Sequence, residues 1–395
     1  MKLTLRQQLT QFAGILQSRL FPALEEELGE LVDSAKRLVA TLELIPLGRF
    51  LPSSRGWVGR PSKDRHAIAN AFIAKAVYGF STTRQLLEAL ERDPQLRRLC
   101  GWESARQLPH ESTFSRAFEE FACMQLPLFV HEVLIRETQK DRLIGHIARD
   151  STAIEARERY PETPAQAAAR QASRQTTPAP RKKGAPKGPH KRYRGGKRPY
   201  VPKGDTRLAQ QRNMTLSQML DDLPCQCDLG GKKDSHGNDH YWRGYKLHWD
   251  VADGQIPISA VLTSASVHDS QVAIPLATMS TQRVSYCYEL MDSAYDAYHI
   301  REESQHLGHV PIIDPKAPGG PKNHHSIPLG TPKRELSWAQ AERYRERTMV
   351  ERVNARLKDE FGGRQVRVRG AAKVMAHLMF GVLALTADQL LKLIR

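Results

Sequence analysis

The alternation of residue types over residues 241–262 determines local structure more firmly than any other pattern in this 395-residue chain. Leu247 and Trp249 fall on one strand face, which is largely apolar, and His248 falls on the opposite face. The pair Asp253-Gly254 is a strong two-residue turn signal, and the apolar run after it supplies the return strand. The sequence therefore predicts a β-hairpin in this segment.

Apolar runs on either side of the hairpin predict further strands. The expected strands cover residues 143–149, 284–291 and 309–313, and a long helix is expected over residues 337–361. This order favours a mixed α/β domain in which three antiparallel strands precede parallel ones. Residues 1–140 carry the 3.6-residue apolar period of helices, so we expect a helical N-terminal domain at 1–140 and an α/β domain at 141–395. The N-terminal helices could form a helix-turn-helix or an ordinary bundle.

The chain carries a formal net charge of +16, and most of it comes from one segment. Residues 170–212 contain 14 lysines and arginines and one acidic residue, a net charge of +13, which leaves +3 for the remainder. The surrounding residues, 161–213, are rich in Pro, Gly and basic residues and poor in large apolar ones, which predicts a disordered basic insertion. A polyanionic partner follows from this charge, and nucleic acid is the commonest one.

Cysteine usage and hydropathy indicate the compartment. The five cysteines are odd in number and scattered, and no signal-peptide pattern opens the chain, so we expect a reduced, cytoplasmic protein without structural disulfides. The most apolar stretch, residues 378–387, is too short to span a bilayer. We therefore expect a buried helix there and no membrane association.

Four residues of the predicted long helix share one face. Tyr344, Arg347, Glu351 and Lys358 fall within roughly 60° of each other at about 100° per residue. A carboxylate flanked by cations and a phenol suits a divalent metal ion beside a phosphate backbone, because the carboxylate can ligate the ion and the cations can neutralise phosphate oxygens. The alternative is a solvated helix face with ion pairs. Ordinary residue frequencies rarely produce this four-position match, so we favour the first interpretation.

This spacing resembles the Y-x2-R-x3-E-x6-K signature of bacterial insertion-sequence transposases of the DDE type. The residues around Asp150 (Asp-Ser-Thr) and Asp292 (Met-Asp-Ser-Ala-Tyr-Asp) also look like this family's motifs at its catalytic aspartates, although Ala294 stands where relatives often have Gly. Residues 110–116 resemble the N-terminal domain that precedes the catalytic domain in such transposases. The resemblance implies a ribonuclease H-like catalytic domain with a mixed five-stranded sheet.

The sequence by itself allows the three carboxylates to converge. Asp150 and Asp292 each close a predicted strand and Glu351 lies within the predicted helix; strand ends meet at one edge of an α/β sheet. Three such oxygen ligands suit two Mg²⁺ ions, with Mn²⁺ as a substitute. Asp269, Asp296 and Asp314 compete with Asp292 for this role.

The resemblance implies a DNA transposase that binds the terminal inverted repeats of its element and target DNA, as a homodimer on paired ends. Asp150, Asp292 and Glu351 would hold the metal ions, and Tyr344, Arg347 and Lys358 would contact the DNA strand near the scissile phosphate. Two alternatives remain open. One is a metal-dependent nuclease without strand transfer, and the other is an inactive transposase-derived DNA-binding protein.

Three other features are more simply explained by structure than by chemistry. His268-Asp269 is typical of a helix cap, and the two tryptophans of the hairpin, Trp242 and Trp249, suit core packing. The C-x-C spacing of Cys225 and Cys227 is poor for a structural zinc site.

Overall fold

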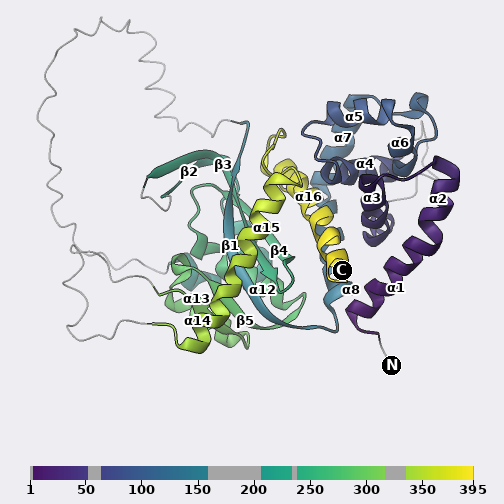
Figure 1. Ribbon diagram of the computed structural model, residues 1–395. Coiled ribbons are helices and arrows are strands. Elements are labelled where there is room, and N and C mark those ends of the chain that lie inside the picture. Colours follow the sequence, from purple (N-terminus) through teal and green to yellow (C-terminus); the bar gives the residue numbers. More distant parts are fainter. Residues whose placement is uncertain (1–2, 52–63, 159–205, 234–237, 316–334, 395) are drawn as a thin grey trace, which may run out of the picture.

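A single mixed β-sheet with helices on both faces forms one half of the molecule, and a cluster of helices forms the other half (Figure 1). The computed structural model describes residues 3–51, 64–158, 206–233, 238–315 and 335–394. The six strands are β1 (Leu143–Glu155), β2 (Asp228–Lys233), β3 (Asp239–Ala252), β4 (Ile256–Ser264), β5 (Ser285–Met291) and β6 (Val310–Ile313).

The sheet combines an antiparallel half with a parallel half. Strand β3 runs antiparallel to β1, β2 and β4, whereas β5 is parallel to β1 and β6 is parallel to β5. The predicted hairpin is confirmed as β3 and β4, which turn at Asp253-Gly254. The three other predicted strand segments are present as β1, β5 and β6, as is the mixed α/β class, while β2 was not predicted.

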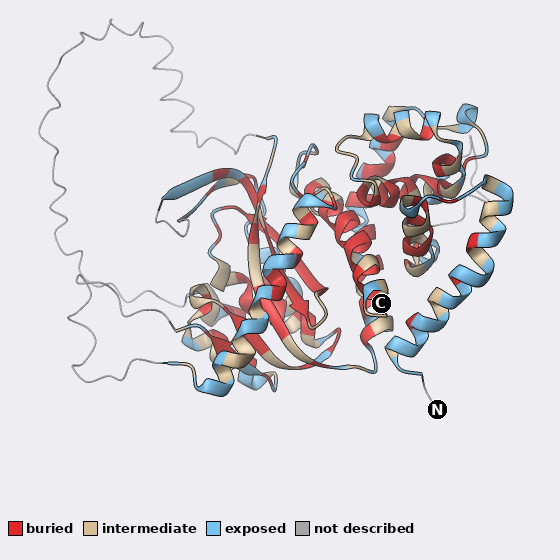
Figure 2. Cartoon of the chain, viewed as in Figure 1, coloured by how far each residue is buried: buried red, intermediate tan, exposed pale blue. Residues whose placement is uncertain are grey.

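Helices cover both faces of the central part of the sheet, so several of its polar side chains are buried, whereas β2 and the start of β3 are largely exposed (Figure 2). Arg149 of β1 donates hydrogen bonds to Asp250 of β3, at 2.8 and 2.9 Å, and to Glu289 of β5, at 3.1 Å. Ser280 of the covering helix donates to Asp250 at 2.7 Å. The three fully buried charges satisfy one another across three strands, which ties β1 to both of its neighbours.

The helices around the sheet are short, apart from two. They are α10 (Arg207–Gln211), α11 (Leu216–Asp222), α12 (Ala273–Thr281), α13 (Tyr298–His306), α14 (Trp338–Tyr344), α15 (Thr348–Asp359) and α16 (Ala371–Lys392), with 3₁₀ turns η4 (Asp269–Val272), η5 (Ser293–Tyr295) and η6 (Arg345–Arg347). Helix α15 crosses the sheet over β1 and β3 (Figure 1).

The described residues of the N-terminal region are mostly helical up to Gln139, as predicted. Its elements are α1 (Leu5–Ile15), the π-helical turn η1 (Leu16–Leu20), α2 (Phe21–Leu28), α3 (Asp33–Leu44), η2 (Leu47–Arg49), α4 (Arg65–Val77), α5 (Thr83–Arg92), α6 (Pro94–Cys100), η3 (Ala105–Gln107), α7 (Glu111–Cys123) and α8 (Leu126–Gln139). Side-chain caps begin several of them; for example, the Thr82 hydroxyl accepts the amide of Gln85 at 3.1 Å at the start of α5.

The C-terminal helix α16 joins the two halves. It packs against α3, α4, α7 and α8 on one side and against β4 and α15 on the other, and one continuous hydrophobic core runs through all of these elements. Among the described helices α16 alone is long and apolar enough to cross a membrane, but 78% of its apolar window is buried inside the protein. The predicted buried helix is therefore present, and it belongs to the helical cluster as much as to the sheet.

Two predicted boundaries are corrected. The expected single helix over residues 337–361 is interrupted by the 3₁₀ turn η6 between α14 and α15, where the Thr348 hydroxyl donates to the carbonyl oxygen of Arg345 at 3.1 Å. The expected disordered insertion at 161–213 extends too far: residues 159–205 lie outside the described ranges, but α10 is ordered and Arg212 pairs with Glu302 at 2.8 Å.

Candidate active site

Asp150 lies on β1, and Asp292 directly follows the adjacent parallel strand β5. The register of β1 and β5 pairs Ala148 with Leu290, and each aspartate follows two residues later. Side chains two residues apart on a strand point to the same face, so both carboxylates emerge on one side of the sheet where β5 ends. Sequence reasoning expected this convergence.

The environment of Asp150 disfavours its ionised form. Burial raises the pKa of Asp150 to about 6, and the negative charges of Asp292 and Asp269 act in the same direction, against the opposing effects of Arg347 and the Ser151 amide. Burial also raises the pKa of Asp292. Two poorly solvated carboxylates therefore share one region, and a cation placed there would stabilise both.

The position of Asp150 in its strand differs from the prediction. The sequence suggested that Asp150 closes a strand, but β1 continues to Glu155 and Asp150 is paired with Trp249 of β3. The strand continues because its other neighbour, β3, is long enough to pair with it throughout. The two aspartates therefore meet where β5 ends, and Asp150 lies within β1 opposite that end.

Asp292 is held by the first turn after β5. It is the N-cap of η5 and accepts the amide of Ala294 at 2.9 Å. Two of its competitors form ion pairs: Asp269 binds Lys246 at 3.0 Å, and Asp296 binds Arg301 at 2.9 Å. The negative charges of Asp269 and of the third competitor, Asp314, still help to raise the pKa of Asp292, so both lie close to the site. Asp292 directly follows the strand that pairs with β1, and it has no close ion pair among the described residues.

Arg347 links the aspartates to the helix that carries Glu351. The charges of Asp150, Glu351 and Asp292, together with Tyr344, raise the pKa of Arg347 against the effect of burial. Its guanidinium donates a 2.6 Å hydrogen bond to Glu351 and lies 5.9 Å from the centre of the Tyr344 ring. Glu351 is 54% exposed, so it reaches the aspartates through Arg347 and not by direct contact.

Lys358 lies apart from these residues. The charges that act on it are those of Lys232, Arg364, Glu155 and Asp359, and burial lowers its pKa. Seven residues of helix separate it from Glu351, roughly 10 Å along the axis. The structure therefore brings together Tyr344, Arg347, Glu351 and the two aspartates, and places Lys358 near the far end of β1.

Asn354 belongs to the site and was missed in the sequence. Its side-chain amide donates to Asp150 Oδ2 at 3.2 Å, and its oxygen accepts the indole N–H of Trp249 at 2.9 Å. Trp249 is fully buried. The available signal was the spacing, because Asn354 follows Glu351 by three residues and so shares its helix face.

The other sequence candidates have structural roles. His268 Nδ1 accepts the amide of Ser270 at 3.3 Å and begins η4, as expected for a cap. Trp242 is 8% exposed and donates to the carbonyl oxygen of Tyr245 at 3.0 Å. Cys225 donates to the carbonyl oxygen of Leu262 at 3.2 Å.

The donor set suits a hard divalent cation. Carboxylate oxygens are the ligands that Mg²⁺ and Mn²⁺ prefer. Burial raises the pKa of both Asp150 and Asp292, so a cation bound between them would stabilise their ionised forms. Within the described ranges, however, no three His, Cys, Asp or Glu side chains are gathered closely enough to hold an ion. The oxygens of Asp150 and Asp292 suit a metal ion. Glu351 can become a third ligand only when its hydrogen bond to Arg347 breaks.

Comparison with known proteins identifies the family. The family model described as a transposase DDE domain matches residues 205–387, and the one described as a transposase domain (DUF772) matches residues 26–120. The first match contains Asp292 and Glu351, whereas Asp150 lies in the unmatched stretch between the two. No curated protein and no solved structure matches the chain. Two transposase families thus match most of the chain in the expected order, and the chain belongs to the DDE transposases of insertion sequences.

Proposed function

We propose that this protein cleaves the ends of an insertion sequence and joins them to target DNA by metal-ion-assisted phosphoryl transfer. One observation carries the proposal: Asp150 and Asp292 lie close together, and their negative charges, with that of Glu351, raise the pKa of Arg347. The match to a transposase DDE domain supports a role of these carboxylates in DNA cleavage and joining.

The strand order supports a ribonuclease H-like fold for the catalytic part. The sequence β4-β3-β1-β5-β6 across the sheet places three antiparallel strands beside two parallel ones, with the first strand in the centre. This is the five-stranded layout that the sequence resemblance implies, with β2 as an extension of β3. We propose residues 141–395 as the catalytic unit and residues 1–140 as a unit that contributes to binding of the DNA ends.

Asp150, Asp292 and Glu351 would hold the metal ions. Two Mg²⁺ ions, or Mn²⁺ in their place, would supply Lewis-acid activation of the attacking oxygen and charge stabilisation of the leaving oxygen. Asn354 would fix the orientation of the Asp150 carboxylate through its hydrogen bond. The pairing of β1 with β5 sets the backbone positions of the two aspartates.

Tyr344, Arg347 and Lys358 would contact the DNA strand. Burial raises the pKa of Tyr344 to about 12, so its phenol keeps its proton at neutral pH and can donate to a phosphate oxygen. Arg347 lies beside the aspartates and would bind the phosphate at the reacting centre. Lys358, about two helical turns beyond Glu351, would contact the strand farther along.

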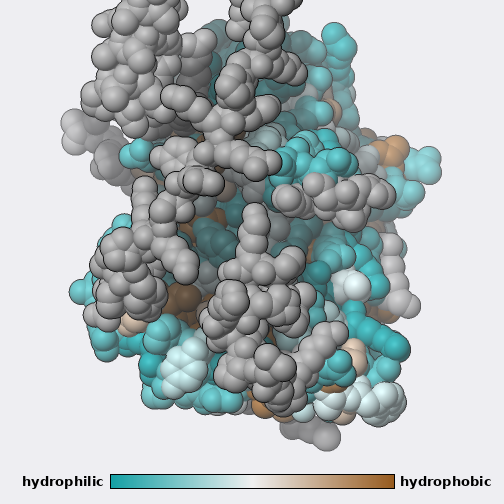
Figure 3. Space-filling model, turned by 90° about the vertical axis from the view of Figure 1, so that its left-hand side faces the viewer, coloured by the Kyte–Doolittle hydropathy of each residue, from teal (hydrophilic) through white to brown (hydrophobic). Residues whose placement is uncertain are grey.

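The partners would be the two terminal inverted repeats of the element and a target duplex, held by a homodimer on paired ends. The surface on the side of α13 and α14 is largely hydrophilic where described residues are visible, as expected for a protein that meets a polar partner (Figure 3). Joining of two ends requires that both repeats are present at once, which a dimer provides.

Cleavage of labelled DNA that carries the repeats flanking the gene tests the proposal. Wild type with Mg²⁺ or Mn²⁺ should cut at the repeat boundary and yield joined products. Asp292→Asn and Glu351→Gln should abolish both products, because an amide is a much weaker ligand than a carboxylate, while binding of the repeats stays within a few-fold of wild type.

The products separate the alternatives. Cleavage without joined DNA would make the protein a metal-dependent nuclease. Binding of the repeats without any metal-dependent product would make it a DNA-binding protein. Loss of binding in Asp292→Asn would instead assign that aspartate a structural role.

A further inference from the structure

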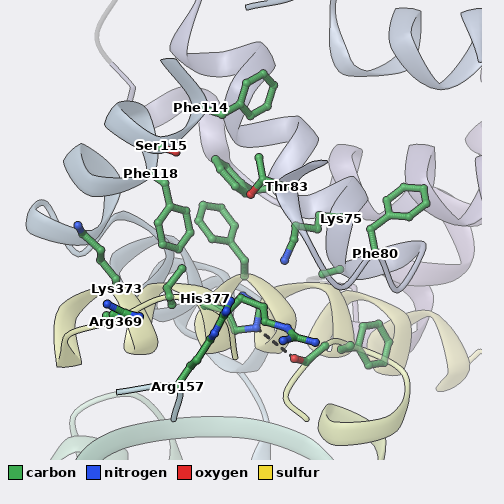
Figure 4. Close-up of a pocket in the computed structure, with 17 residues that line it drawn as sticks. Lys75, Phe80, Thr83, Phe114, Ser115, Phe118, Arg157, Arg369, Lys373 and His377 are labelled. Atoms are coloured by element: carbon green, nitrogen blue, oxygen red, sulfur yellow. Dashed lines mark hydrogen bonds between the residues drawn. The ribbon is translucent and has the colours of Figure 1, made fainter. Parts of the chain in front are cut away.

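A cavity of about 480 Å³ opens where the helical cluster meets the end of the sheet (Figure 4). Its walls come from α4, α5 and α7, from the residues that follow β1, and from the connection between α15 and α16 together with α16 itself. Arg157, on this cavity, lies seven residues beyond Asp150, or roughly 20 Å along an extended chain. The cavity is therefore separate from the carboxylate site.

The titratable side chains that line this cavity are basic, and none of them is acidic. Five basic side chains line it and no aspartate or glutamate does; they are Lys75, Arg157, Arg367, Arg369 and Lys373. Lys373 pairs with Glu119 at 2.8 Å. The other four form no ion pair with any residue in the described parts of the chain. A group of unpaired cations around one concave space attracts an anion.

Lys75 is the cavity cation whose charged form a bound anion would stabilise most. It projects from α4 toward His377, while Arg157 approaches the same space from the end of β1 (Figure 4). Burial lowers the pKa of Lys75 to about 8. The neighbouring His377 adds no charge, because burial and the charge of Lys75 lower its pKa to about 3 and its ring bonds the carbonyl oxygen of Gly362 at 3.1 Å.

A rigid aromatic wall faces these cations. The rings of Phe72 and Phe118 lie 4.9 Å apart and those of Phe72 and Phe380 5.5 Å apart, and all three are at least nine-tenths buried. Because these rings are fixed in the core, the cavity keeps its shape when a ligand enters. A preformed space with an apolar wall and a few converging donors is typical of ligand sites.

We propose that this cavity binds a phosphate group of a DNA strand, and that it is a second DNA contact of the protein in addition to the carboxylate site. Tetrahedral oxyanions match the arrangement of arginines and lysine, since guanidinium groups bind phosphate oxygens in pairs. DNA as the source of the phosphate rests on the proposed function; the anion site itself does not.

Chemical labelling of Lys75 tests the site directly. Pyridoxal 5′-phosphate carries both a phosphate and an amine-reactive aldehyde, and borohydride fixes the product for peptide mapping. At pH 8 Lys75 should be labelled faster than Lys140, an exposed lysine outside the cavity. A short mixed-sequence DNA duplex should protect Lys75 several-fold at concentrations that leave Lys140 unaffected.

Two outcomes of the labelling would overturn the proposal. Labelling of Lys75 that is indifferent to the duplex would remove the DNA contact. Equal protection by inorganic phosphate at the same phosphate concentration would assign the cavity to a free anion and not to DNA.

Charge removal provides a second test that does not depend on Lys75. Arg367→Gln with Arg369→Gln removes two exposed cavity cations, and Arg6→Gln with Arg19→Gln removes two exposed cations on the N-terminal helices as the matched control. The cavity variant should bind duplex DNA about tenfold or more weakly at moderate salt, with the slope of log K against log salt reduced by about one to two. Equal behaviour of the two variants would overturn the proposal.

These measurements require neither metal nor cleavage. Their outcome therefore does not depend on whether the proposed function is correct. If wild type cuts and joins DNA but the cavity variant binds normally, the cavity inference falls alone. If no metal-dependent chemistry is found but the cavity variant binds weakly and Lys75 is protected, the transposase chemistry falls and the DNA contact stands.

Discussion

Asn354 is the residue whose two hydrogen bonds connect the carboxylate site to the core. It donates to Asp150 and accepts from Trp249, so one side chain positions a site carboxylate and satisfies a buried indole. We predict that Asn354→Ala lowers metal-dependent cleavage by about 10- to 100-fold, as removal of such outer contacts typically does, while DNA binding is retained. Cleavage rates at saturating DNA, beside an equilibrium binding curve, measure both effects.

The variant Asn354→Asp separates the two bonds. A carboxylate at this position can still accept from Trp249, but it repels Asp150 where the amide donated to it. We expect its stability to denaturant to exceed that of Asn354→Ala, with cleavage at least as impaired. If Asn354→Asp cleaves as well as wild type, the bond to Asp150 has no part in the reaction.

At the scale of elements, the pairing of β1 with β3 places Asp150 and depends on one glycine. Gly244 pairs with Glu155 at the end of this ladder and with Asp228 of β2 on its other side. Its φ is +150°, and a Cβ there would overlap the carbonyl oxygen of Ile154 and lie 2.7 Å from the amide nitrogen of Ala156. No other residue type allows the three strands to meet this closely.

Gly244→Ala should therefore destabilise the protein, by about 1–3 kcal/mol from backbone strain alone and more if the ladder opens. Gly14→Ala is the matched control, since Gly14 lies within α1 and a Cβ there meets nothing within 4 Å; it should stabilise by about 0.5–1 kcal/mol. Denaturant unfolding of both variants measures the difference. A Gly244→Ala protein as stable as wild type would show that β3 can shift away from β1 at no cost.

Elements that the sequence predicted well are those with a strong period. The apolar alternation of β3 and the turn at Asp253-Gly254 specify the hairpin locally, and the strand segments of β1, β5 and β6 are apolar runs. The end of β1 was not predicted, because pairing with β3 carries that strand on to Glu155. Strand β2 has no such pattern, because its sequence Asp-Leu-Gly-Gly-Lys-Lys lacks alternating apolar residues. The ring of Trp242 instead covers Gly230, so this strand is stabilised by a neighbour that only the fold supplies.

At the scale of the whole molecule, the sequence could not show that the two halves share a core. Helix α16 is apolar on nearly all sides, and a helix without a polar face gives no indication of which elements surround it. The convergence of Asp150 and Asp292 was predictable, because adjacent strand positions follow from the α/β pattern. The contacts of Asn354 and the cationic cavity were not predictable, because they depend on how α15 and α16 pack against elements that are distant in the sequence.

The shared core also contains a histidine that should make the whole protein sensitive to acid. His131 of α8 is fully buried, and burial together with the charge of Arg283 lowers its pKa to about 3. An unfolded chain has a histidine pKa of about 6.5, so between pH 6.5 and 3 the unfolded state binds the proton and the folded state does not. This site therefore reduces the free energy of unfolding by about 1.4 kcal/mol for each pH unit below 6.5.

His131→Gln should remove that dependence. Between pH 6.5 and 4.5 the wild type should lose roughly 2–3 kcal/mol of stability more than the variant, whatever the variant's stability at pH 7.5. Other titrating groups, Asp150 among them, act equally in both proteins, so the difference between the two curves isolates His131. Denaturant unfolding at four pH values measures it. Parallel curves would mean that the folded core accepts a proton at His131, and that α8 and the sheet separate more readily than their packing implies.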